Sequence, residues 1–308
     1  MMENEIDREL LEKIADMLGK PVGAFNIRKD SGCDGRQSTE HIQITSKEDG
    51  KSGIDIRIQD GTVGETCHIP VIITKPGIQE MVYNDFYIGE NCDVNIVAGC
   101  GIHNCGDQES RHDGLHTFYV GKNSHVKYTE KHYGDGDGKG GRVMNPQTVV
   151  YLEEGASIQM ETVQIRGIDS TKRDTKIVCG KGAEAIVTER LLTHGDQTAE
   201  SDMEIVLDGE GSRGRVISRS VAQDTSSQVF YPRMVGNAQC FGHVQCDSII
   251  MGDAKIKSIP AITANCTEAQ LVHEAAIGKI AGDQLLKLET LGLTPEEAEE
   301  CILKGFLA

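Results

Sequence analysis

The chain has 308 residues and a net charge of −17, with 35 glycines, seven tyrosines, six phenylalanines and no tryptophan. This acidity disfavours binding to nucleic acids or anionic membranes, because both are polyanions. The small number of aromatic residues argues against a large aromatic core. No apolar run approaches the ~20 residues that a membrane-spanning helix needs.

The first eight residues are acidic and no apolar signal core follows them, so we expect no secretion signal and a cytoplasmic protein. The ten cysteines are then better interpreted as thiols, ligands or small buried residues than as disulfides. No Cys-x-x-Cys pair occurs, which argues against a preformed zinc ribbon or a ferredoxin-type site.

The N-terminal segment predicts an amphipathic helix. Gly19 and Pro21 close it, and its apolar residues recur at three- and four-residue intervals, at Ile6, Leu10, Leu11, Ile14 and Leu18. We expect this helix to cover one end of the core; binding to a partner is the alternative.

Short alternating strands are predicted at 41–45 and 54–58, and a six-residue repeat follows. Its six positions hold, in order, an apolar residue, any residue, usually Gly, a charged residue, Asn or Gly, and a small residue. Its starts are spaced by 32, 32, 27 and 29 residues, at Tyr87, Tyr119, Tyr151, Val178 and Leu207. Asn or Gly at the fifth position suits a left-handed corner, and a small sixth residue fits the tight inner bend.

A turn of fixed period followed by an alternating strand predicts a solenoid, in which each unit buries its apolar face on its neighbours. The regular period and the scarcity of two-residue hairpin signals favour a right-handed parallel β-helix over an antiparallel sandwich. Whether one period holds one coil or two stays open at this stage.

Two glycine-rich stretches suggest ligand loops without meeting the requirements. Asp135-Gly-Asp-Gly-Lys-Gly-Gly141 has Pro146 where a calcium loop of the EF type needs a bidentate Glu, so we interpret it as a flexible surface loop. Gly180-Lys-Gly and Gly278-Lys-Ile lack the spacing of a phosphate loop. We therefore expect no ATP site on this chain.

A mid-chain segment concentrates possible metal ligands. The spacings Cys-x2-His-x-Cys and His-x3-His can place three or four donors around one metal. The candidates are Cys100, His103, Cys105, His112 and His116, with His125 and His132 following. Alternate residues of a solenoid strand point outward, so a solvated face is an equally good interpretation.

The C-terminus predicts a helical hairpin. Residues 283–291 have helical spacing and Gly292 stops them. Thr294 then caps a second helix, with Pro295 at its first position and Glu297 three residues after the cap. The expected buried face of this second helix is Ala298, Cys301, Ile302 and Phe306. Such a hairpin must dock on something larger, and we expect part of its apolar surface to cover the end of the β-helix.

Four ordered strings resemble the SufB/SufD family. They are Cys246-Asp-Ser-Ile-Ile-Met-Gly-Asp253, His273-Glu-Ala-Ala-Ile-Gly-Lys-Ile-Ala-Gly-Asp-Gln-Leu285, Leu291-Gly-Leu-Thr-Pro-Glu-Glu-Ala298 and Ile302-Leu-Lys-Gly-Phe306. The chain resembles the compact, SufB-like form. A further cysteine that larger SufB proteins carry after the Met-Gly-Asp is replaced here by Ala254-Lys-Ile.

The resemblance implies a parallel β-helix and a scaffold for a transient iron–sulfur cluster, not an enzyme. It places the cluster or persulfide at Cys246, with His273 and Glu274 at an interface. The implied partners are a SufC-type ABC ATPase, a second copy or a SufD-like subunit, a sulfur donor and apo iron–sulfur proteins.

We expect the ATPase to dock through Leu285, Leu288 and Leu291 of the hairpin. The expected ranges are 1–30 for the N-terminal helix and linker, 31–262 for the β-helix and 263–308 for the docking region. The competing function is a binding or carbohydrate-active β-helix without a cluster. Such proteins are commonly secreted and carry aromatic platforms, which the absence of a signal and of tryptophan disfavours.

Overall fold

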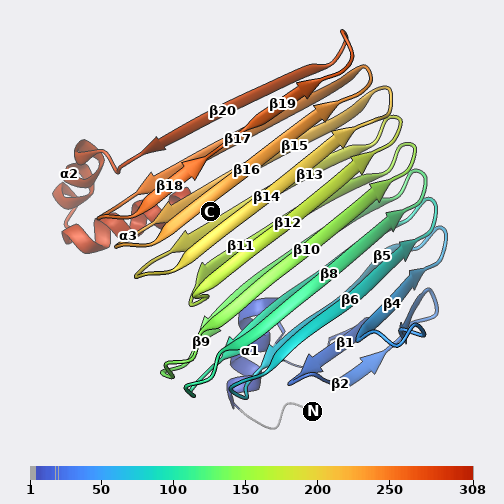
Figure 1. The fold of residues 1–308 in the computed structure, drawn as a ribbon, viewed down its shortest axis with the longest axis horizontal. Helices are drawn as coiled ribbons and strands as arrows, with labels where there is room; N and C mark the ends of the chain where they lie inside the picture. Colours follow the sequence, from blue (N-terminus) through green and yellow to red (C-terminus); the bar gives the residue numbers. More distant parts are fainter. Residues whose placement is uncertain (1–4, 18, 20, 308) are drawn as a thin grey trace.

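The fold is a β-solenoid of about eight turns whose two walls are ten-stranded sheets (Figure 1). The computed structural model describes residues 5–17, 19 and 21–307. One wall, sheet A, runs in the order β2 (Gly32–Gln37), β1 (Ala24–Lys29), β5 (Val63–Ile73), β7 (Asp93–His103), β9 (His125–Asp135), β11 (Ser157–Arg166), β13 (Glu184–Thr193), β15 (Ser212–Ala222), β17 (Cys240–Ile250) and β20 (Gln270–Gly278).

The facing wall, sheet B, contains the intervening strands. Its order is β18 (Lys255–Ser258), β16 (Ser227–Gly236), β14 (Thr198–Leu207), β12 (Ser170–Cys179), β10 (Arg142–Leu152), β8 (Ser110–Val120), β6 (Gln79–Ile88), β4 (Gly53–Ile58) and β3 (Ile42–Ser46), and β19 (Ala261–Ala264) also pairs with β16. Only the pairs β1–β2 and β3–β4 are antiparallel; the other described pairings are parallel. The predicted β-helix is confirmed.

Each sequence repeat makes one coil. Asp93 pairs with His125, and His125 pairs with Ser157, so one 32-residue period returns the chain to the neighbouring strand of the same sheet. The coil is long because it holds one strand of 10 or 11 residues in each wall. The question of one coil or two is thereby answered.

The repeat corners have the predicted backbone. The fifth residue is left-handed in all five repeats, with φ of 56°, 55°, 70°, 62° and 74° at Asn91, Asn123, Gly155, Gly182 and Gly211. The small sixth residues are at most 1% exposed, at Cys92, Ser124, Ala156, Ala183 and Ser212. The corner pattern therefore sets where each coil bends.

The N-terminal helix α1 (Glu5–Ala15) lies on the side of the solenoid. Leu18, which we placed in this helix, is outside the described residues. The helix packs on the outer face of sheet A, where a Cβ at Gly99 would lie 2.4 Å from the carbonyl oxygen of Ile14. Our expectation that α1 covers an end of the solenoid is wrong. The glycines of β7 leave room for the helix against the outer face of sheet A, whereas Ile42 and Ile56 of the antiparallel β3–β4 pair fill the core at the end.

The C-terminal helices α2 (Gly282–Thr290) and α3 (Pro295–Phe306) form as predicted. The capping box between Thr294 and Glu297 is complete, and Gly292 has a φ of 99°. The predicted buried face is only partly right. Ala298 and Leu303 are buried, whereas Cys301 is exposed and Ile302 and Phe306 are half-buried.

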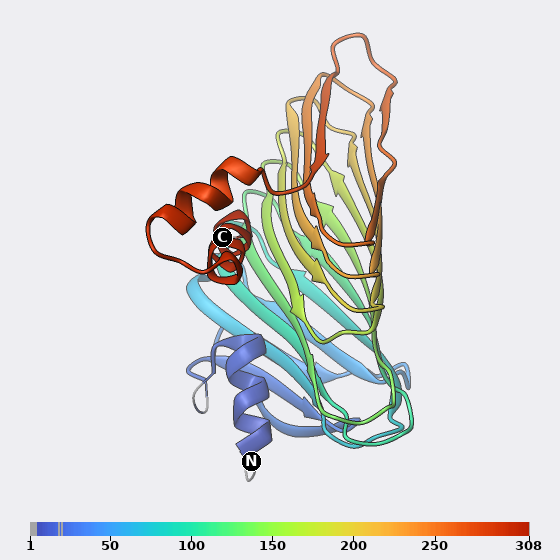
Figure 2. The ribbon, with the colours of Figure 1, turned by 90° about the vertical axis from the view of Figure 1, so that its left-hand side faces the viewer.

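The hairpin also lies beside the solenoid, on the same side as α1 (Figure 2). Leu285, Leu303 and Leu307 line a hollow of about 810 Å³ together with Val163 and Leu192 of sheet A. The hairpin therefore does not cover the end of the β-helix, because its apolar residues face the outer surface of β11 and β13. β20, within the range 263–308, is still part of the solenoid.

All ten cysteines lie among the described residues and are free thiols, as expected. Neither α1, α2 nor α3 combines the length and the apolar composition that crossing a membrane requires, over the part of the chain that the structure describes.

Candidate functional site

Cys246 and His273 meet inside the last turn of the solenoid. Cys246 lies on β17 and His273 on β20, the edge strand of sheet A. Cys246 pairs with Ala275, so His273, two residues earlier, faces the same side of the sheet. The Cys246 Sγ and His273 Nε2 atoms are 3.7 Å apart. A soft thiolate and an imidazole at this separation are a usable ligand pair for iron.

Burial keeps both groups uncharged. It raises the pKa of the Cys246 thiol to about 12, and Cys246 is only 3% exposed. Burial, followed by the nearby His243, lowers the pKa of His273. The imidazole can therefore accept a metal at neutral pH, whereas the thiol must first lose its proton, which metal binding itself can drive.

Glu274 is not part of this pair. Because successive side chains of a strand point to opposite faces, Glu274 points to the outer face of β20, where its Oε2 lies 3.5 Å from Nε2 of His243. Its side chain is 64% exposed. The structure thus separates the predicted trio into an inward Cys246–His273 pair and an outward Glu274.

A row of buried polar residues leads along the inner face of sheet A to Cys246. Consecutive strands pair residue by residue in the order Glu130, Thr162, Glu189, Ser218 and Cys246. We call these five residues the polar row. Each is at most 5% exposed. The sequence analysis missed this row, although polar residues at inward strand positions, 27 to 32 residues apart, could have indicated it.

Arg173 of sheet B neutralises the two carboxylates of the polar row. Its Nη1 donates to Glu130 Oε2 at 2.6 Å, and its Nε lies 3.7 Å from Glu189 Oε1. Glu189 also accepts hydrogen bonds from Ser201 and Ser218, at 2.9 and 3.3 Å. Such ionic groups are buried only when paired, so this network fixes the facing strands in register at a cost in desolvation.

Cys100 lies on β7 of sheet A, beside His112 and His132. Burial alone would raise the pKa of the Cys100 thiol, but His112 and His132 outweigh it and hold the pKa at about 7. Cys100 and Glu80 in turn raise the pKa of His112 to about 10, against the effect of burial. His112 Nδ1 is 2.8 Å from Glu80 Oε1. The two histidines therefore lower the pKa of this thiol, whereas burial raises that of Cys246.

His116 is held apart from Cys100 by its own hydrogen bonds. Its Nδ1 lies 2.8 Å from the Tyr128 hydroxyl and its Nε2 3.2 Å from the Asn84 amide nitrogen. Burial lowers the pKa of His116 to about 4, so the ring is neutral. Both ring nitrogens are occupied, which leaves none directed at Cys100.

His103 and Cys105 form a third group, at the end of β7. Cys105 is exposed and its Sγ lies 3.0 Å from Nε2 of His103. The five mid-chain candidates are therefore divided among three places. Over the residues that the structure describes, no group of three or more His, Cys, Asp or Glu side chains is arranged to hold a metal ion. Metal binding by this segment stays a prediction.

The predicted docking leucines differ in exposure. Leu291 is 72% exposed, and Leu285 and Leu288 are half-buried. Leu286, which we did not select, is 61% exposed. The outward apolar surface of the hairpin is therefore centred on Leu286 and Leu291.

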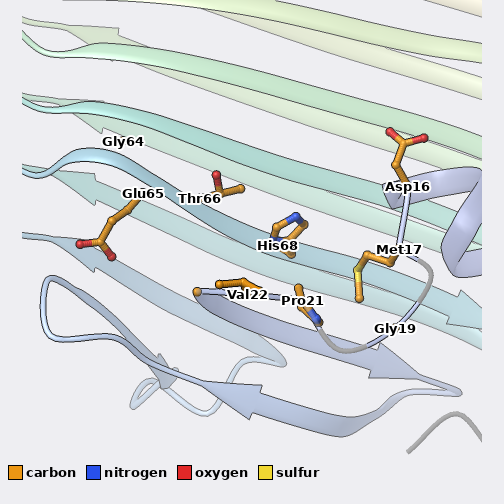
Figure 3. Close-up of a pocket in the computed structure, with 10 residues that line it drawn as sticks. Asp16, Met17, Gly19, Pro21, Val22, Gly64, Glu65, Thr66 and His68 are labelled. Atoms are coloured by element: carbon orange, nitrogen blue, oxygen red, sulfur yellow. The ribbon is translucent and has the colours of Figure 1, made fainter.

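A second hollow, of about 570 Å³, lies near the N-terminus. Figure 3 shows His68 and Thr66 of β5 on one side and Met17, Pro21 and Val22 on the other. Nδ1 of His68 makes no hydrogen bond within the described residues, and burial lowers the pKa of this histidine. No thiol lines this hollow, so it does not compete with Cys246 as a sulfur site.

Comparisons with known proteins identify relatives over most of the chain. The family described as "SUF system FeS cluster assembly, SufBD core domain" matches residues 77–306. An iron–sulfur cluster assembly SufBD family protein of Methanocaldococcus jannaschii is 27% identical over 97% of this chain and 96% of its own length. One from Pyrococcus horikoshii is 28% identical over 94% and 88%. One from Methanothermobacter thermautotrophicus is 25% identical over 75% of this chain but only 56% of its own, longer length.

Proposed function

Because the chain belongs to the SufBD family of iron–sulfur cluster assembly proteins, we propose that it is a scaffold that holds a nascent cluster at Cys246 and His273. The observation that supports this most directly is the 3.7 Å approach of Cys246 Sγ to His273 Nε2 in the last turn. Iron and sulfide are then substrates that the chain collects and passes on. The free thiols fit the reducing cytoplasm.

The open end of the solenoid supports pairing with a second subunit. β20 is an edge strand, and unpaired edges are templates for another chain. Large apolar side chains gather on this turn, where Ile262, Val272 and Ile277 are 42%, 42% and 46% exposed. Exposed apolar groups beside a free edge favour a protein interface. We propose a homodimer or a pair with a SufD-like subunit, in which Glu274 and His243 lie at the contact.

The hairpin supports docking of a SufC-type ATPase. Leu286 and Leu291 present apolar surface to solvent, and the hairpin is tied to sheet A because Arg219 Nη1 donates to the Phe306 carbonyl at 3.3 Å. Arg219 lies on β15, which pairs with β17. Movement of a docked ATPase can therefore reach the strand that carries Cys246. Opening of the last turn would admit iron to a thiol that is otherwise buried and protonated.

The docking surface is tested with charged variants. Leu286→Glu and Leu291→Glu should abolish co-purification with the ATPase, and Val22→Glu, a 93% exposed site on the opposite part of the chain, should not. If both hairpin variants fold, by circular dichroism, and still bind at the wild-type stoichiometry, the ATPase docks elsewhere.

The cluster site is tested by anaerobic reconstitution with iron and sulfide in the presence of the ATPase. Cys246→Ser should lose nearly all bound iron and sulfide and the visible charge-transfer absorbance. Cys179→Ser is a matched control, because Cys179 is also a buried thiol whose pKa burial raises to about 12, but it lies in the apolar core of sheet B.

Two results would contradict the proposal. One is a normal cluster content in folded Cys246→Ser. The other is an equal loss in Cys179→Ser, which would assign the effect to packing. The competing function, a binding or carbohydrate-active β-helix, predicts no cluster in any of the variants.

A further inference from the structure

Ser258 faces Cys246 from the opposite wall of the last turn. Cys246 and His273 lie on β17 and β20 of sheet A, whereas Ser258 is the last residue of β18 in sheet B. Ser258 pairs in register with Phe230, two residues after the buried Gln228, so its side chain points into the solenoid. One turn of the chain therefore places a thiol, an imidazole and a hydroxyl around the same interior space.

The hydroxyl of Ser258 lacks a hydrogen-bond partner. Its Oγ is shielded from solvent and makes no hydrogen bond to the described residues. It lies close enough to Cys246 to act on the thiol: burial raises the pKa of Cys246 to about 12, and the Ser258 side chain opposes this rise. A buried hydroxyl without a partner is destabilising, and a neutral thiol is only a weak acceptor. A thiolate is a charged and much stronger acceptor.

The hydrogen-bond ladder of sheet B is interrupted directly after Ser258. β18 pairs with β16 up to Ser258, and β19 resumes the pairing at Ala261. Between them, the amide of Ile259 donates to the Phe230 carbonyl at 2.8 Å, whereas Pro260 has no amide hydrogen to donate. Irregular positions in strands are common beside functional sites, where they change the direction of a side chain. The irregularity in the last turn is thus adjacent to the residue that faces Cys246.

We propose that Ser258 is a positioning residue of the cluster site, whose hydroxyl donates a hydrogen bond to the Cys246 sulfur once that sulfur is a metal-bound thiolate. The inference rests on the proposed function, because it needs a metal at Cys246. The hydroxyl stabilises the charge of the sulfur in an interior that excludes water and keeps the sulfur directed towards His273. Hydrogen bonds to ligating sulfurs are among the factors that tune iron–sulfur centres.

The test uses cobalt(II) in place of iron, because a thiolate bound to cobalt gives a charge-transfer band that reports on the sulfur. Cobalt chloride is titrated anaerobically into the full-length chain in the presence of the ATPase and without sulfide. The band of this site is the part of the spectrum that Cys246→Ser removes. Ser258→Ala should weaken cobalt binding about tenfold, as the loss of an outer-shell partner commonly does. It should also shift the band to lower energy, since a thiolate without a hydrogen bond gives up charge more easily.

Two further variants separate positioning from packing. Ser258→Thr keeps the hydroxyl and should keep the wild-type affinity and band. Ser212→Ala is the matched control, because the Ser212 Oγ is also buried without a partner, but Ser212 pairs with Cys240, six residues before Cys246 on β17. It should change neither cobalt affinity nor the band.

An unshifted band in Ser258→Ala would overturn the proposal, and so would an equal shift in Ser258→Thr or Ser212→Ala. A band that depends on Cys246 but not on Ser258 contradicts this inference alone. If Cys246→Ser removes no band, the cluster site fails and this inference fails with it.

Discussion

Between β9 and β17 the interior of the solenoid has an apolar half and a polar half, and the two are stabilised differently. At β5 and β7 the second half is filled instead by apolar residues such as Ile73 and Ile102. In the apolar half, where the strands of sheet A begin, Ile96 and Ile158 face Phe118 and Ile177 of sheet B, and all are at most 1% exposed. In the polar half, two to four residues further along the same sheet A strands, the polar row and Arg173 are also buried, each at most 5% exposed. The hydroxyl of Tyr128, bonded to His116, marks the boundary between the halves.

The apolar half and the polar half contribute differently to the stability of the solenoid. Apolar contacts are non-directional and stabilise the coil by burial alone. Buried ions and hydroxyls need exact partners and gain little net stability even when they have them. We therefore infer that the polar half, where aliphatic residues could fill the coil, serves more than stability. The polar row ends at Cys246, which supports a functional role for the polar half.

The largest expected effect comes from removing the central cation of the polar half. Arg173→Met leaves Glu189 buried without a counter-charge and Glu130 with His132 as its remaining cationic neighbour, so we expect a loss of about 3–5 kcal/mol in the free energy of unfolding. Urea denaturation at neutral pH measures it. Lys172→Met, which removes the exposed neighbour paired with Glu200, should leave the free energy of unfolding almost unchanged, because solvent screens this surface pair. Equal losses in the two variants would show that the buried ion network contributes no more to stability than an exposed ion pair.

A smaller loss is expected in the apolar half. Phe118 stacks on Phe86 with ring centroids 4.2 Å apart, and both side chains are fully buried. Phe118→Leu removes this aromatic contact and some volume, so we expect a loss of about 1–2 kcal/mol. Because no charge changes, the loss should be the same at pH 5 and pH 8. A loss that varies with pH would mean that the halves are coupled.

The polar half should also give the pH dependence. Burial alone would raise the pKa of Glu80, but His112 and Arg28 outweigh it and hold the pKa at about 2, below the ordinary 4.5. Its contribution is therefore complete above pH 4.5 and is lost as the pH falls towards 2. In Glu80→Gln the slope of unfolding free energy against pH in this window should be shallower by up to about 1.4 kcal/mol per pH unit. Glu153→Gln, on an exposed turn, serves as the control; an unchanged slope for Glu80→Gln would contradict the expectation.

The same division explains what the sequence could predict. Each corner and the alternating aliphatic residues after it form a pattern that can be recognised within a short stretch of sequence. Asn91, Gly155 and their equivalents were therefore enough to predict the solenoid. The C-terminal caps are local and were also predicted. The polar row is set by which residues meet across strands 27 to 32 positions apart, and its five members are of four different residue types. Glu274 shows the limit: adjacent to His273 in sequence, it lies on the opposite face of the strand.

The smallest expected effect is a gain in stability. Thr162 is 2% exposed, pairs in register with Glu130 and Glu189, and its Oγ1 makes no hydrogen bond to the described residues. Thr162→Val removes a buried hydroxyl without a partner, so we expect the free energy of unfolding to rise by about 1 kcal/mol. Thr171→Val is the matched control, because its hydroxyl donates to the Met144 carbonyl at 2.6 Å and its loss should destabilise by a similar amount.

Activity separates the two interpretations of this gain. If the polar row serves Cys246, the more stable Thr162→Val should assemble less cluster in the anaerobic reconstitution, since stabilising changes at functional positions commonly reduce activity. Thr171→Val lies on sheet B, outside the row, and should keep the wild-type cluster content despite its lower stability. A Thr162→Val variant that is both more stable and fully able to assemble a cluster would show that the row ends at Cys246 without serving it.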